Sequence, residues 1–451
     1  MMTYVIAGQT GPSTIPVIMK RTILLIALAL AIPAGISRFV AAGWQGLLHD
    51  DPVIGYRRAG SNDAVAELQR RIDSGEVRLE FNERNGYLES VLRHLKIPVS
   101  SQGLVFSKTS FQLHRISPSN PRALYFADEI YVGWVRGGDM LELAAVDPNL
   151  GGVFYMLEQR KAERPRFFRN DECLQCHSAG ATGNVPGFMV RSVYPDERGY
   201  PIAPLGSHIT NYSSPIRQRW GGWYVTGQHG SERHAGNMIF DEKSDPDRPE
   251  QLTGSNLSKI EGRFDPAGYP SVESDIVALM VLEHQTQMHN LITRLNYETR
   301  LALNNDKVMR EALNEPERGM SESTHRRIGN AAESLVRHLM FIGETRWKTP
   351  ISGTSGFTAE FAAGGRRDAR GRSLRDLDLK QKLFRYPCSY LIYSPAFDAL
   401  PQPALEEVYR RLRLALIGQS GDKDFAAVPE EDRKAVLEIL RETKPGLPSN
   451  F

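Results

Sequence analysis

Between residues 103 and 158 the chain consists of short runs rich in aromatic and β-branched residues, with turn signals between them. The runs are 123–126, 130–135, 140–146 and 152–157. Gly-Gly-Asp at 137–139 and Asp-Pro-Asn-Leu-Gly at 147–151 are the turn signals. Such runs favour pleated strands, and such short connections join antiparallel neighbours. We therefore predict an antiparallel β-meander in this region.

Helical patterns lie on both sides of the predicted meander. Residues 61–96 predict two helices, the first capped by Asp63, and residues 271–304 carry apolar side chains at steps of four. Further helical patterns occupy 321–343, 403–418 and 430–442, whereas the Gly/Arg-rich stretch 352–373 predicts a loop. The segment between the predicted meander and the helical pattern at 271–304, about 165–270, is rich in Gly and Pro. It has strand-like pieces at 187–194 and 220–226. We expect an α+β fold with a β-meander, an irregular middle segment and a helical C-terminal half.

The composition excludes several classes of protein. The hydrophobic fraction is 41% and the charged fraction is 24%, which excludes a disordered chain, a collagen-like fibre and a polytopic membrane protein. Residues 1–42 hold three basic residues and no acidic ones, so the remaining chain has 52 basic against 53 acidic residues and a net charge of −1. A near-neutral body gives no electrostatic reason to expect a nucleic-acid partner.

The N-terminus has the layout of an export signal. Lys20 and Arg21 precede an uncharged apolar run of 15 residues, 22–36, which is shorter than the ~20 residues of a membrane-spanning helix. The small residues 40–42 offer a cleavage point after Ala42. We expect residues 1–42 to be a cleaved signal peptide, with an uncleaved N-terminal membrane anchor as the alternative. Either version places the rest of the chain in the periplasm or another exported location.

The strongest chemical signal is the pentapeptide Cys173-Leu174-Gln175-Cys176-His177. Two thiols three positions apart match the two vinyl groups of haem, and the imidazole that follows is placed to ligate the iron. The chain resembles the c-type cytochromes at these five residues. The resemblance implies that Cys173 and Cys176 attach haem c covalently and that His177 is the proximal iron ligand. A zinc site, a thioredoxin-like redox pair and a plain disulfide are the alternatives.

The resemblance is limited to this motif. Small single-haem carriers are compact helical domains of about a hundred residues, whereas this chain has 451 residues and places the motif in its middle. On this basis residues 43–164 form a helical and β-meander region, 165–270 a haem-attachment region, and 271–451 a helical region packed on it. A single motif also argues against multihaem proteins and di-haem peroxidases.

The identity of the second axial ligand separates an electron carrier from an enzyme. The candidates are His229, His234 and Met238 in a Gly-rich stretch, and His284 in the long helical pattern. His289, His208 and Met189 are weaker candidates, and an absent protein ligand is a further alternative. For His284, a satisfied core histidine is the more ordinary interpretation.

Contacts with the haem propionates could come from Arg217, Arg219, Trp220 and Arg233. The simpler interpretation is a solvated charge for each arginine and a core aromatic side chain for the tryptophan. Cys388 is expected to be a buried, inert thiol. The leading expectation is an exported monohaem cytochrome that passes electrons to a redox partner protein. The alternatives are a haem-dependent oxidoreductase with an open iron position and a haem-based sensor that binds a ligand without turnover.

Overall fold

The computed structural model describes residues 48–260, 262–316 and 319–451. The predicted export signal at 1–42 lies outside the described residues. Leu47–Phe451 forms one compact unit. Within the described residues, no helix combines the length and apolarity that a membrane-spanning helix requires.

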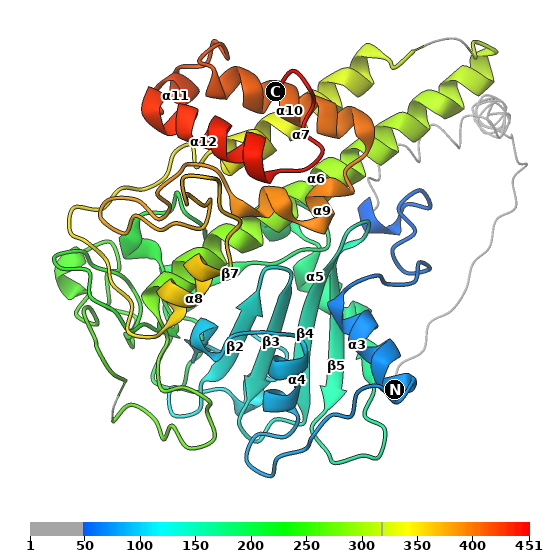
Figure 1. Ribbon diagram of the computed structural model, residues 1–451. Coiled ribbons are helices and arrows are strands. Elements are labelled where there is room, and N and C mark those ends of the chain that lie inside the picture. The colour runs from blue at the N-terminus through cyan, green and yellow to red at the C-terminus, as the bar shows by residue number, and fades with distance from the viewer. Residues whose placement is uncertain (1–47, 261, 317–318) are drawn as a thin grey trace, which may run out of the picture. The chain divides into compact units, whose positions relative to one another are not determined.

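This unit contains a mostly antiparallel sheet of seven strands, which lies in the lower half of Figure 1. Its strands lie in the order β6-β5-β4-β3-β2-β1-β9. The bounds are β1 Gly103–Val105, β2 Arg122–Ala127, β3 Ile130–Val135, β4 Met140–Asp147, β5 Gly151–Glu158, β6 Phe167–Arg169 and β9 Trp223–Tyr224. The four runs predicted between 123 and 157 are therefore confirmed as neighbouring antiparallel strands. Gly137 (φ 70°) and Gly151 (φ 74°) take the left-handed backbone that their turns require.

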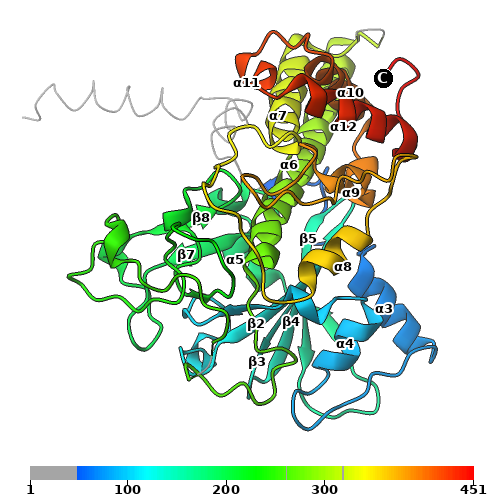
Figure 2. The ribbon, with the colours of Figure 1, turned by 60° about the vertical axis from the view of Figure 1, so that its left-hand side comes forward.

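One face of the sheet packs against the first two helices, α3 (Ala64–Asp73) and α4 (Leu88–His94). Figure 2 shows these helices on one side of the sheet. Asp63 caps α3 as predicted, because its carboxylate accepts from the amides of Val65 and Ala66. The same carboxylate accepts a 2.6 Å hydrogen bond from the Tyr155 hydroxyl, which ties the start of α3 to β5.

The opposite face meets α6 (Ile276–Leu313), the 38-residue helix of the C-terminal half. Gln285 on α6 donates to the carbonyl oxygen of Ala127 at 2.7 Å and to the Tyr131 hydroxyl at 3.0 Å, which ties the helix to β2 and β3. The remaining α-helices are α5 Leu174–His177, α7 Glu322–Leu339, α8 Phe357–Ala363, α9 Pro395–Asp398, α10 Gln402–Leu416, α11 Lys423–Ala426 and α12 Glu430–Thr443. The α+β class is confirmed.

The middle segment is irregular, and one expectation there and one for the later stretch 352–373 need correction. The predicted strand at 220–226 is reduced to β9, because Trp220 (φ 62°) and Gly222 (φ 81°) leave the extended conformation. Within 352–373, α8 replaces part of the predicted loop, where buried Phe357 and Phe361 anchor it. A two-stranded hairpin, β7 (Val190–Val193) with β8 (Ser207–Thr210), accounts for the other strand-like piece.

Short 3-10 helices connect many of these elements. They are η2 Leu48–Asp50, η3 Val99–Ser101, η4 Leu113–Arg115, η5 Asp171–Cys173, η6 Gly180–Thr182, η7 Ala203–Leu205, η8 Ile216–Gln218, η9 Pro249–Gln251 and η10 Tyr390–Tyr393.

Candidate haem-attachment site

The Cys-x-x-Cys-His motif forms a short helical turn made of η5 and α5. The Asn170 side chain accepts from the amide of Glu172 and so starts the turn, and the buried Leu174 anchors it in the core. Both cysteines are free thiols. Cys176 is exposed, whereas Cys173 is half-buried, and burial, reinforced by the charge of Glu142, raises the pKa of its thiol to about 11. The two sulfurs therefore lie on one turn and are not joined in a disulfide.

The imidazole of His177 is fixed in one tautomer. Its Nδ1 lies 2.9 Å from the carbonyl oxygen of Gly187, and because a carbonyl can only accept, Nδ1 carries the proton. Nε2 then holds a lone pair, and it makes no hydrogen bond within the described part of the chain. Burial lowers the pKa of His177, which favours the neutral ring. A neutral imidazole that donates from one nitrogen and leaves the other free is the arrangement found in metal-ligating histidines.

The backbone that holds His177 is itself held by α6. The Asn290 side chain donates to the carbonyl oxygen of Phe188 at 2.7 Å and accepts from its amide at 2.8 Å. Gly187 allows this approach, since a Cβ there would lie 2.1 Å from Asn290 Oδ1. The amide of Gly187 also donates to the carbonyl oxygen of His177 at 2.8 Å. Asn290 is therefore a positioning residue for the proximal histidine.

The motif turn lies beside a partly open area of the sheet, on the face that α6 also meets. The ring of His177 packs 4.8 Å from that of Phe154 on β5. Strand register places Leu124, Gly133, Glu142, Met156 and Phe168 in one row across this face. Phe168 is 44% exposed, an unusual position for a large aromatic side chain. A flat apolar cofactor would find hydrophobic contacts here.

An ion pair crosses this open area. Arg122 Nη2 lies 2.7 Å from Glu142 Oε2, and a Cβ at Gly133 would collide with the guanidinium, so the glycine is what allows the arginine to lie across β3. The charges of Arg122 and Glu142 influence the pKa of both Cys173 and His177, which places all four groups in one neighbourhood. A row of apolar and charged side chains thus lies beside an imidazole nitrogen that has no hydrogen-bond partner in the described chain.

Sequence reasoning missed Arg122, Glu142 and Asn290. Glu142 interrupts the apolar run of β4, whereas Arg122 stands at the start of β2, so only Glu142 gave a clear signal. Asn290 had no comparable signal, because its role depends on a contact across more than a hundred residues.

The structure does not bring the distal candidates to the motif. No contact in the described residues links His229, His234, Met238 or His284 to Cys173, Cys176 or His177. Met238 packs on a small separate cluster, and its sulfur accepts from Thr253 at 3.5 Å.

His229 and His234 are unsuitable as iron ligands in their present hydrogen bonds. Nε2 of His229 accepts from the amide of Asn256 at 3.1 Å, and Nδ1 of His234 accepts from the amide of Gly236 at 3.0 Å. The other nitrogen of each ring must then carry the proton, which leaves no lone pair for a metal. Ligation would require the loss of a buried backbone hydrogen bond.

His284 is a core residue of α6. Its Nε2 lies 2.7 Å from Ser389 Oγ, and its ring stacks on His338 at 5.1 Å and packs 4.4 Å from Phe341. This surrounding confirms the core position that the sequence offered as the ordinary interpretation, although Nδ1 of His284 has no hydrogen-bond partner in the described chain.

The three arginine candidates for propionate contacts have other partners, whereas Nε1 of Trp220 has none in the described chain. Arg219 is buried and donates to Glu283 Oε2 at 3.0 Å, so it is neither a solvated charge nor a free donor. Arg217 lies 3.7 Å from Asp247, and Arg233 donates to backbone carbonyls of its own loop. Cys388 is fully buried, as expected, and burial raises the pKa of its thiol to about 12, which disfavours the reactive thiolate.

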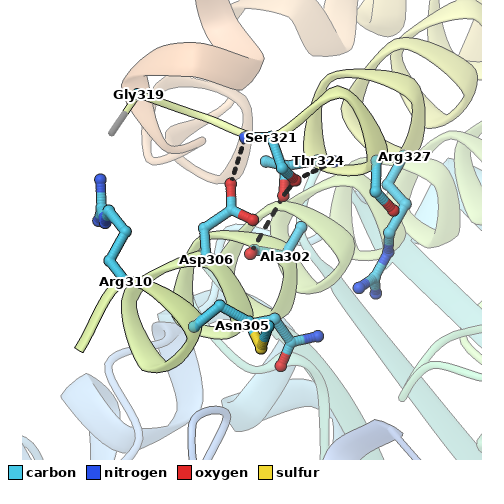
Figure 3. A pocket seen from close by; sticks show the side chains of 10 residues that line it. Ala302, Asn305, Asp306, Arg310, Gly319, Ser321, Thr324 and Arg327 are labelled. Atoms are coloured by element: carbon cyan, nitrogen blue, oxygen red, sulfur yellow. Dashed lines mark hydrogen bonds between the residues drawn. The ribbon is translucent and has the colours of Figure 1, made fainter. Parts of the chain in front are cut away.

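A pocket of about 260 Å³ lies elsewhere, where the end of α6 meets the start of α7 (Figure 3). The Asp306 carboxylate accepts from the amide of Ser321 there at 2.8 Å, and Thr324 donates to the carbonyl oxygen of Ala302 at 3.3 Å. Two of its polar side chains are thus engaged in local hydrogen bonds to the backbone, and none of the motif residues lines it.

No protein-family model, no curated protein and no solved structure matches this chain.

Proposed function

We propose that the protein is an exported c-type cytochrome that carries one haem, bound through thioether bonds to Cys173 and Cys176, with His177 as the proximal ligand. The observation that carries the proposal is the locked tautomer of His177, whose Nδ1 donates to Gly187 while Nε2 has no hydrogen-bond partner among the described residues. The two unpaired thiols on the same turn and the open apolar area beside them support it.

Each residue of the site has a defined task in this proposal. Cys173 and Cys176 fix the cofactor covalently, and the Gly187 carbonyl holds the imidazole in its orientation and increases the basicity of Nε2. Arg122 and Glu142 supply charges beside the cofactor, and Phe154 supplies an apolar contact for the histidine. When bound, haem supplies reversible one-electron chemistry between ferrous and ferric iron.

We further propose that the protein transfers electrons in the periplasm to a redox partner protein. The signal-like N-terminus supports export, since covalent haem attachment takes place outside the cytoplasm. The exposure of Cys176 supports transfer, because the edge of a cofactor attached there would lie at the surface.

The second candidate is a haem oxidoreductase, or a ligand-binding sensor, with an open iron position. The hydrogen bonds of His229 and His234 favour it, since they deprive the two histidines of a lone pair for iron.

Absorption spectra of protein expressed with haem-attachment machinery test both candidates. Electron transfer predicts sharp reduced bands that do not change with carbon monoxide. An open iron predicts a high-spin spectrum that shifts with carbon monoxide and would contradict the electron-transfer proposal. Cys176→Ala should weaken covalent attachment, whereas Cys388→Ala, which removes the buried inert thiol, is the matched control and should leave the spectrum unchanged.

A further inference from the structure

Three buried N–H groups in the segment 220–234 have no acceptor in the described chain. They are Trp220 Nε1, His229 Nδ1 and His234 Nε2. None of these side chains is more than 1% exposed. The ring of His234 lies 5.3 Å from that of Trp220 and 4.9 Å from that of His229. The three rings therefore pack in one buried cluster, with His234 between the other two.

Backbone hydrogen bonds fix the two imidazoles as donors. The amide of Asn256 donates to Nε2 of His229, and the amide of Gly236 donates to Nδ1 of His234, so the protons must sit on the remaining nitrogens. Burial lowers the pKa of His234 to about 3 and also lowers that of His229, so both rings are neutral. Carbonyl oxygens of Glu232 and His229 lie near the His229 ring, but none accepts from Nδ1.

The backbone at Trp220 is strained. Its φ of 62° is rare for a bulky residue, yet the indole is fully buried against His234. Neighbouring bonds maintain this conformation, since Arg219 is anchored to Glu283 and the amide of Gly221 donates to Ser192. Strain of this kind collects at functional sites. Trp223, three residues later, differs in having a partner: its indole N–H donates to the carbonyl oxygen of Arg191 at 2.9 Å.

The number of donors decides what fits the cluster. A single water accepts only two hydrogen bonds, so it leaves one of the three N–H groups unpaired, and its own two protons also need acceptors. A small oxyanion has more lone pairs and no proton to place. The charge of Arg233 reaches both imidazoles, with Glu232 opposing it at His229, and a positive charge favours an anion.

We propose that Trp220, His229 and His234 form a binding site for a small oxyanion held by three uncharged N–H donors. The site is independent of the haem proposal, since it shares no residue with the motif turn. Uncharged donors arranged around developing or resident negative charge are an established means of holding an oxyanion.

Titration of the full-length protein with sodium nitrate and sodium formate, followed by the ¹⁵N signals of the tryptophan indoles, tests this site. We expect the Trp220 indole signal to move saturably, while the Trp223 signal stays in place. Trp220→Phe should weaken nitrate binding about tenfold to a hundredfold, the usual effect of losing one hydrogen bond to a charged group. Trp223→Phe is the matched control and should leave the affinity unchanged.

Two results would overturn the proposal. One is a Trp220 indole signal that ignores nitrate, formate and phosphate while exchanging magnetisation with a long-lived buried water. The other is nitrate affinity that Trp220→Phe and Trp223→Phe reduce equally. If Trp220→Phe does not fold, the wild-type titration decides alone, because movement of the Trp220 signal supports the site and its absence contradicts it.

Discussion

Replacement of Asn290 by leucine should disturb the proximal histidine from across the molecule. The Asn290 amide makes two short hydrogen bonds to the backbone of Phe188, at 2.7 and 2.8 Å. Leucine has a similar size but no polar atoms, so Asn290→Leu leaves a buried N–H and a buried C=O without partners. Each such group costs about 1–3 kcal/mol. After the gain from burying leucine, we expect a net loss of about 2–4 kcal/mol in the free energy of unfolding.

Asn296 provides the matched control on the same helix. It is also buried, but its Nδ2 has no partner in the described chain and its Oδ1 accepts only a long 3.4 Å bond from Arg300. Asn296→Leu should therefore cost less than about 1 kcal/mol. Urea unfolding of the haem-loaded proteins, followed by far-ultraviolet circular dichroism, compares the two variants.

The same pair of variants separates positioning from simple stability. A loosened Gly187 carbonyl weakens the hydrogen bond from His177, lowers the basicity of Nε2 and should raise the reduction potential of the haem. Asn296→Leu should not change that potential. The reasoning is refuted if the two variants lose equal stability, or if Asn290→Leu destabilises the protein while its potential matches the wild type.

Two further predictions concern stability. Burial lowers the pKa of three histidines well below 6.5, so below pH 6.5 the unfolded chain binds more protons than the folded chain. Their contribution to the free energy of unfolding is therefore complete above pH 6.5 and should fall as the pH drops toward 4, by about 1.4 kcal/mol per pH unit for each histidine. Urea titrations at several pH values measure this loss. These histidines are His234, His289 and His338. Gly187→Ala should lower the free energy of unfolding by about 1–3 kcal/mol, and with it the urea midpoint, because the new Cβ collides with the Asn290 amide. Gly180→Ala is the control, since its new Cβ meets nothing within 4 Å, and it should change the midpoint little. Equal midpoints for the two variants would contradict the close approach of Asn290 to Gly187.

Local sequence patterns predicted much of the fold. The meander strands and the cap at Asp63 were predictable because each depends on neighbouring residues. The pairing of β9 with β1 was not, since it joins segments more than a hundred residues apart and leaves no local signal. The helix α8 was missed because its Gly- and Arg-rich flanks masked two buried phenylalanines.

The motif itself predicted the candidate site, but not its surroundings. Cys173, Cys176 and His177 follow from spacing alone. The tautomer of each histidine depends on a single backbone hydrogen bond that only the folded chain defines. This holds for His177 and also for His229 and His234, whose tautomers disfavour them as iron ligands. The same bonds leave the remaining nitrogens of His229 and His234 as donors without an acceptor in the described chain.

Covalent haem attachment is the central claim, and its most direct test is the haem absorbance of the denatured, reduced protein in pyridine after expression with haem-attachment machinery. We predict that the absorbance stays with the wild-type polypeptide and with Cys388→Ala, and is lost when Cys173 and Cys176 are both replaced by alanine. Haem that separates from the denatured wild-type chain, or a chain that acquires no haem, would contradict the account.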